Sequence, residues 1–145
     1  MHRFPFLHLA CLLSGMLLAQ VTLRAQIHDQ LHWVFPLDSV AEVRFDLVDP
    51  FEVANWEGNQ VMVTSEITVY NASKGIMHFF IEENKRYDIV ADTLQPKVLT
   101  LESYQSRRAP IQSKGETCYE QIQVKIFLPT SFAPVDGQLW RRKEE

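Results

Sequence analysis

Apolar and polar residues alternate at every second position over several stretches of this chain. The clearest stretch is residues 120–128, in which aliphatic side chains occupy the even positions 122, 124, 126 and 128. Residues 43–47 and 60–69 alternate in the same way, and shorter candidates lie at 31–35, 51–56, 87–91 and 98–102. A period of two is typical of strands that face a core on one side and water on the other, and it favours antiparallel sheets.

Turn-forming residues lie between these stretches and divide them into separate strands. Asp49 and Pro50 follow the stretch at 43–47, and Gly58 with Asn59 predicts a hairpin between 51–56 and 60–69. A polar loop at 106–116 precedes the clearest stretch. The pattern as a whole predicts a mainly β fold, either an antiparallel β-sandwich or a short β-solenoid.

One segment departs from this rhythm and predicts a short helix at about residues 73–85. Ile76, Phe79 and Phe80 have the spacing of an apolar helical stripe, and Ser73 can cap its N-terminus. A buried strand over residues 76–81 is the alternative. We favour the helix because residues 82–86 are better helix formers than strand formers.

Residues 1–25 have the composition of a secretory signal peptide. Arg3 supplies a positive charge, an apolar run follows, and no acidic residue precedes Asp29. Cleavage is expected after Ala19 or Ala25, and the more polar mature start favours Ala25. An uncleaved membrane anchor is the alternative, although the apolar run is shorter than the roughly 20 residues that span a bilayer.

The remaining residues, 26–145, are expected to form a single all-β domain whose C-terminal tail frays from about residue 136. No stretch after residue 25 is apolar for long enough to span a bilayer. Of the two cysteines, Cys11 lies in the signal-like segment and Cys118 stands alone, so no disulfide is expected within the mature chain. We expect Cys118 to be a small buried apolar residue rather than a nucleophile.

Composition and charge exclude several classes of protein. The 145 residues include 14 Lys and Arg against 18 Asp and Glu, a net charge of −4, which gives no reason to expect a nucleic-acid partner. A hydrophobic fraction of 46% excludes wholesale disorder. Only 5 Gly and 7 Pro exclude collagen-like and low-complexity chains.

His28 and His32 are the first candidates for metal binding, because on a helix their spacing would direct both imidazoles at one ion. The zinc-protease pattern needs Glu after the first His, however, and Asp29 stands there with no helical run around it. We therefore expect solvated histidines, and a packed or rim position for His78. The chain also has no Gly-x-Ser-x-Gly and no glycine-rich phosphate loop. The sequence thus predicts no catalytic, metal-ligating or cofactor-binding residue.

Several carboxylates could supply a glycosidase pair or a calcium site if folding brought them together. They are Glu42, Asp46, Asp49, Glu52, Glu57 and Glu66. We expect a solvated face or a turn for them, because Asp46 and Glu66 hold outward positions of alternating strands. Asn71 begins an N-glycosylation sequon with Ala72 and Ser73.

Basic and aromatic residues offer two further candidate surfaces. A basic pair lies at residues 107–108 and a basic triplet at 141–143. We expect the first to belong to a solvated loop and the second to a solvated tail, rather than to a membrane or polyanion contact. Trp33, Trp56 and Trp140 are candidates for a sugar-binding face, although Trp33 and Trp56 are expected to cap strand ends against the core.

Three segments together carry a resemblance to a known family. They are VAEVRFD at 40–46, FEVANWEGNQVMV at 51–63 and QVKIFLP at 123–129. With the export-like start, they resemble the secreted all-β domains of Bacteroidetes-type bacteria described as auto-transporter adhesin head domains, over about residues 38–135. The resemblance implies an exported all-β domain and no catalytic residues. The chain departs from the family in its shorter length, its few glycines and the helix expected at 73–85.

These features predict an exported, non-enzymatic interaction or structural module of the periplasm, outer surface or secreted fraction. Its expected partner is a protein or glycan of the cell envelope, bound at a sheet edge or an aromatic rim, with no cofactor. Two alternatives remain open. One is a carboxylate-based hydrolase, and the other is an envelope protein tethered by an uncleaved N-terminus.

Overall fold

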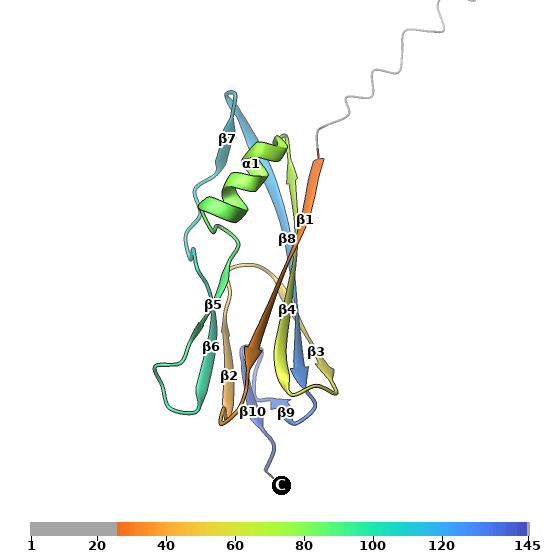
Figure 1. The fold of residues 1–145 in the computed structure, drawn as a ribbon, viewed down its shortest axis with the longest axis vertical. Coiled ribbons are helices and arrows are strands. Elements are labelled where there is room, and N and C mark those ends of the chain that lie inside the picture. Colours follow the sequence, from red (N-terminus) through yellow and green to blue (C-terminus); the bar gives the residue numbers. More distant parts are fainter. Residues whose placement is uncertain (1–25, 145) are drawn as a thin grey trace, which may run out of the picture.

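The computed structural model describes residues 26–144, so the predicted signal peptide and both of its cleavage sites lie outside the described residues. Within that range the chain forms ten strands and one short helix, arranged as two sheets with the helix beside one end of the first sheet (Figure 1). The fold is therefore mainly β, as the alternation predicts. No helix within residues 26–144 is long and apolar enough to cross a membrane.

The first sheet, here called sheet A, contains the longest strands. Its order is β1 (Gln26–Pro36), β4 (Gln60–Tyr70), β8 (Glu116–Pro129) and β3 (Phe51–Trp56), and the short β7 (Ile111–Ser113) also pairs with β8. The predicted alternation is visible in the burial of β4, where Val61, Val63 and Val69 are buried. Polar residues that alternate with them along β4, such as Glu66, face solvent.

The second sheet, here called sheet B, is built from shorter strands. Its order is β5 (Ile89–Asp92), β6 (Val98–Ser103), β2 (Glu42–Asp46), β10 (Leu139–Arg142) and β9 (Phe132–Pro134). In Figure 1 its strands lie beside the lower halves of β4 and β8.

Six of the eight strand pairs in the described residues are antiparallel, as expected, but two run parallel, which the alternation did not predict. In sheet B, β2 runs parallel to β6, and in sheet A, β3 runs parallel to β8. Parallel neighbours need a long connection between them, and intervening strands and the helix supply it here. Alternation along one strand records which residues face the core, but it carries no information about the direction of the neighbouring strand.

The predicted hairpin at Gly58 and Asn59 is also wrong, although the chain does turn there. β3 and β4 do not pair with each other, because β8 lies between them in sheet A. Gly58 serves a different purpose: a Cβ at this position would collide with the indole ring of Trp56. The Trp56 indole N–H in turn donates to the carbonyl oxygen of Gln60 at 3.0 Å, which closes the turn.

The main hydrophobic core lies between the two sheets. Phe45, Leu101 and Phe132 from sheet B pack with Val63 and Ile126 from sheet A, and each is nearly inaccessible to solvent. Alternate residues of a strand share a face. The inward faces of the two sheets therefore form this core, and polar residues lie on the outward faces.

The helix predicted at about 73–85 is confirmed, and the alternative strand over 76–81 is wrong. α1 (Lys74–His78) continues directly into one turn of π-helix, η1 (Phe79–Glu83). The Ser73 hydroxyl caps its N-terminus by accepting from the Ile76 amide at 3.3 Å. Met77 and Ile81 pack in a second core with Ile67 of β4 and Cys118 of β8. The helix thus covers the part of sheet A that sheet B does not reach (Figure 1).

The expected frayed tail from about residue 136 is wrong, because β10 forms inside sheet B. β10 pairs with β2 on one side and β9 on the other. The Arg142 side chain donates to the carbonyl oxygens of Val40 at 2.8 Å and Leu37 at 2.9 Å, and Trp140 packs against the main core. Residues 141–143 are exposed, as expected, but Arg141 and Arg142 belong to β10, whose partner strand β2 lies far away in the sequence.

Candidate functional site

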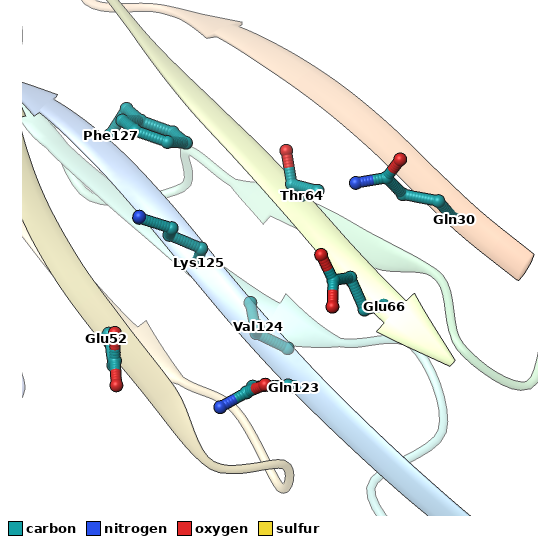
Figure 2. Close-up of a pocket in the computed structure, with 8 residues that line it drawn as sticks. All are labelled: Gln30, Glu52, Thr64, Glu66, Gln123, Val124, Lys125 and Phe127. Carbon is teal, nitrogen blue, oxygen red and sulfur yellow. The ribbon is translucent and has the colours of Figure 1, made fainter. Parts of the chain in front are cut away.

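The outer face of sheet A carries a groove of about 410 Å³ that is lined from all four of its long strands (Figure 2). Its lining residues are Gln30, Glu52, Thr64, Glu66, Gln123, Val124, Lys125 and Phe127. Except for Val124 and Phe127, these are polar residues at the water-facing positions of their strands. The alternation therefore predicted their exposure, but not that they would line one groove.

Strand register places the polar side chains of the groove in two rows across the sheet. In the first row, Glu66 of β4 lies between Gln30 of β1 and Gln123 of β8. In the second row, Lys125 of β8 lies between Thr64 of β4 and Glu52 of β3. Figure 2 shows these side chains projecting from four neighbouring strands on the same side of the sheet. Cross-strand neighbours of this kind are close enough to contact one ligand together.

Most polar groups of the groove are available to a ligand. Within the described residues, the side chains of Glu52, Glu66 and Gln123 make no hydrogen bond, and no ion pair involves Lys125. The Lys125 ammonium group instead lies 5.3 Å from the centre of the Phe127 ring. The groove therefore combines two acceptor-only carboxylates, primary amides that both donate and accept, and one cation beside an aromatic ring.

The two histidines considered for metal binding lie on β1 rather than on a helix, with side chains on the outer face. Nδ1 of His28 is 3.3 Å from the Thr68 hydroxyl, and Nδ1 of His32 is 3.2 Å from the Thr64 hydroxyl. Both residues are exposed. In residues 26–144, no group of three or more His, Cys, Asp or Glu side chains is placed to hold a metal ion.

The candidate carboxylates separate into different environments. Glu52 and Glu66 line the groove of sheet A, whereas Glu57 is exposed in the turn after β3. Asp46 lines a wider depression of about 500 Å³ on the outer face of sheet B, together with Arg44, Asp92 and Glu102. Hydrogen bonds from Arg141 and then Arg44 lower the pKa of Glu42, so that carboxylate belongs to a surface ion-pair cluster.

Asp49 and Arg108, expected in a turn and a solvated loop, form a bidentate ion pair instead. The two guanidinium N–H groups of Arg108 donate to the Asp49 carboxylate at 2.8 and 2.7 Å. The guanidinium also lies over the Tyr87 ring, 5.4 Å from its centre. This pair ties the loop before β7 to the connection between β2 and β3, whereas Arg107 beside it is exposed.

A second buried ion pair, which the sequence did not indicate, joins the end of the helix to β8. Arg86 donates to both oxygens of Glu120 at 2.8 and 2.7 Å, and also to the Ala109 carbonyl oxygen at 2.8 Å. Burial works to raise the pKa of Glu120, but the hydrogen bonds from Arg86 and Tyr87 outweigh it and leave that pKa below its usual value. The polar atoms of this ion pair are already hydrogen-bonded within the protein. We therefore interpret the pair as structural and not as a ligand site.

The remaining sequence candidates are used by the fold. Cys118 is buried, as expected, and its thiol donates to the Asn71 carbonyl oxygen at 3.2 Å. Burial, and then the charges of Glu120 and Glu116, raise the pKa of this thiol. In the sequon, Asn71 adopts a positive φ of 63° and Ser73 is the helix cap. Trp33 packs against the main core from within β1.

Comparison with known proteins assigns no family to this fold. No protein-family model, no curated protein and no solved structure matches the chain significantly. The groove of sheet A is therefore identified from its own geometry and chemistry.

Proposed function

We propose that this protein is an exported, non-enzymatic interaction module that binds a glycan of the cell envelope in the groove of sheet A. One observation carries the proposal: four strands present unpaired carboxylate, amide and ammonium groups in two rows on one exposed face. Side chains that are not used to hold the fold together are available for recognition.

A carbohydrate suits the donors and acceptors of the groove. Glu52 and Glu66 only accept hydrogen bonds and Lys125 only donates, while the amides of Gln30 and Gln123 do both. A ligand that satisfies all of them needs many groups that donate and accept at short intervals, which is the chemistry of sugar hydroxyls. The Phe127 ring adds an apolar surface against which a sugar ring can pack.

The scaffold and location complete the proposal. Residues of both sheets share one core, which supports a β-sandwich rather than a short β-solenoid, with two parallel strand pairs in place of an all-antiparallel arrangement. The signal-like composition of residues 1–25 supports export to the periplasm, the outer surface or the medium. Mass spectrometry of the recovered protein would find a start near Gln26 after cleavage, whereas an intact Met1 in the membrane fraction would favour the tethered alternative.

The binding test uses an array of bacterial surface and cell-wall oligosaccharides, followed by titration of any hit against isotope-labelled protein. Chemical shifts are expected to change for amides of β4 and β8 around Glu66 and Gln123. Substitution Gln123→Ala is expected to weaken binding at least about tenfold, because removing groups that pair with a buried ligand commonly costs over 1.4 kcal/mol.

Gln121→Ala is the matched control, since Gln121 is an exposed residue of the same strand and face but does not line the groove. Equal loss of affinity in both variants, or an array without any hit, would contradict glycan binding in this groove.

A second candidate function is a carboxylate-based hydrolase, because Glu52 and Glu66 line the same groove. In such an enzyme one carboxyl group protonates the leaving oxygen and the other attacks the sugar or activates water. Incubation with the bound oligosaccharide distinguishes the two functions. Product formation that Glu66→Gln abolishes while binding persists would establish the hydrolase, and an unchanged oligosaccharide would support the binding module.

A further inference from the structure

The outer strand β1 presents a long free edge. All of its residues pair with β4 in one unbroken register, from Gln26 opposite Tyr70 to Pro36 opposite Gln60. β1 has no other strand neighbour in its sheet, and its backbone forms no backbone–backbone hydrogen bond with a turn or loop of the described residues. The Gln30 amide donates locally to the Asp29 carboxylate at 2.8 Å. The backbone N–H and C=O groups that point away from β4 are therefore unpaired with any other strand between residues 26 and 144.

The other sheet edges in the described part of the chain are short. β3 has 6 residues, β5 has 4, and β7 and β9 have 3 each, whereas β1 has 11. Edge strands that avoid association are commonly short, bulged, rich in lysine or marked by an inward-pointing charge. Of these features β1 has only the last, because Asp29 occupies the same alternate positions as Ile27 and Leu31. β1 contains no Lys, Arg or Gly, its register with β4 has no bulge, and its only proline is the final residue.

The inward face of β1 is incompletely covered. Ile27, Leu31, Trp33 and Phe35 point toward the two cores, yet all four remain half-buried. The apolar face of sheet A thus extends to the edge strand β1, where its side chains remain partly exposed to solvent. An additional strand beside β1, with apolar residues on the same face, would bury this row further.

We propose that the free edge of β1 pairs with β1 of a second copy of this chain, antiparallel about a two-fold axis near Leu31. Unpaired backbone donors and acceptors along an extended strand are complemented by another extended strand, and β1 itself has the required alternation. A two-fold axis needs one self-complementary surface, which a strand pairing with its own copy provides. The result is one continuous sheet formed by the two copies of sheet A.

The side chains of β1 suit this pairing. With Leu31 opposite its own copy, Ile27 lies opposite Phe35 of the second copy, so apolar residues meet on the inward face. Asp29 is the sole carboxylate of β1 and lies opposite Trp33, so like charges do not confront each other. Cross-strand apolar pairs of this kind contribute to sheet stability, whereas like charges directly opposite one another destabilise it.

Sedimentation velocity and native mass spectrometry of the purified chain over a range of concentrations test the proposal. A dimer that dissociates on dilution is expected. The double substitution His28→Lys and His32→Lys adds charge at exposed positions of β1 and is expected to weaken dimerisation at least tenfold. Gln95→Lys with Gln138→Lys adds the same charge at exposed positions of the turns beside sheet B and is expected to leave the dimer unchanged.

Chemical cross-linking identifies the surface independently of the lysine variants. His32→Cys treated with a short bismaleimide is expected to give a covalent dimer, whereas Gln95→Cys is not. The native thiol, Cys118, is buried and does not interfere. A protein that stays monomeric, a dimer that cross-links through Gln95→Cys alone, or a β1 edge that pairs only with strands of other proteins would each overturn self-pairing. None of these readouts depends on glycan binding.

Discussion

The Tyr87 hydroxyl donates to Oε1 of Glu120 at 2.7 Å, and the same oxygen accepts from Arg86 at 2.8 Å. Burial, and then the neighbouring carboxylate, raise the pKa of Tyr87, so the phenol remains a donor at physiological pH. Arg86 and Glu120 are 34 positions apart in the sequence. Their contact fastens the residues after the helix to β8 and so stabilises the second core.

Substitution Glu120→Gln is expected to destabilise the protein by about 3 kcal/mol, because it leaves the buried Arg86 guanidinium without its charge partner. Denaturant titration followed by circular dichroism measures the loss. Glu116→Gln is the matched control: Glu116 is an exposed carboxylate on the same strand, and a change within about 0.5 kcal/mol is expected. Equal effects of the two substitutions would contradict a structural role for the ion pair.

Glu120 also makes stability depend on pH. The pKa of Glu120 in the folded state is below the usual 4.5. Between these two pKa values the unfolded state therefore binds more protons than the folded state. Its contribution is complete above pH 4.5 and is lost as the pH falls through the folded-state pKa. Burial raises the pKa of Asp88, which acts in the opposite direction, so the measurement compares wild type with Glu120→Gln. The difference in unfolding free energy should shrink in acid; parallel curves would refute this assignment.

Gly58→Ala is expected to destabilise the protein by about 1–3 kcal/mol, because the new methyl group would collide with the Trp56 indole. Gly137→Ala provides a direct comparison, since a Cβ there meets no atom within 4 Å and should be tolerated. Thermal unfolding gives the stability of both variants, and tryptophan fluorescence reports displacement of the indole. Equal stability of the two variants would show that the turn adapts to the added carbon.

Truncation after Gln138 is expected to remove most of the free energy of unfolding, which for a domain of this size is about 5–15 kcal/mol. The truncation deletes β10, which lies between β2 and β9. Ending the chain after Lys143 instead keeps β10 intact and serves as the control. A cooperative unfolding transition of normal size in the shorter protein would restore the frayed-tail interpretation.

Thiol labelling tests the environment of Cys118. Burial raises the pKa of the thiol, so little reactive thiolate is available and access is restricted. We expect slow modification of the native protein and rapid, complete modification in denaturant, both measured by mass shift. Rapid labelling under native conditions would indicate that the contact between Cys118 and the Asn71 carbonyl group opens readily.

Local patterns in the sequence predicted which residues face the core, but not which strands are neighbours. Val61, Val63 and Ile126 alternate with polar residues, and each is buried as expected. Nothing near Asp49 indicates Arg108, 59 positions away, because an ion pair between distant segments leaves no periodic signal. The sequence alone therefore predicts a turn for Asp49 and a solvated loop for Arg108.

The same distinction applies to the groove. The polar, outward positions of Glu66, Gln123 and Lys125 follow from the alternation of their own strands. Their arrangement in rows depends on β8 lying between β3 and β4, a strand order that the turn at Gly58 and Asn59 suggested incorrectly. Strand order together with the parallel register of β3 and β8 places Glu52 beside Lys125.

The position of β10 has a consequence for how the chain matures. Arg141 contacts Glu42 across 99 positions, and β10 is synthesised after every other strand described here. Sheet B therefore has a gap between β2 and β9 until residues 139–142 have been synthesised and can insert between them. Folding is expected to be slow, because the contacts that complete the sheet are among the most distant in the sequence.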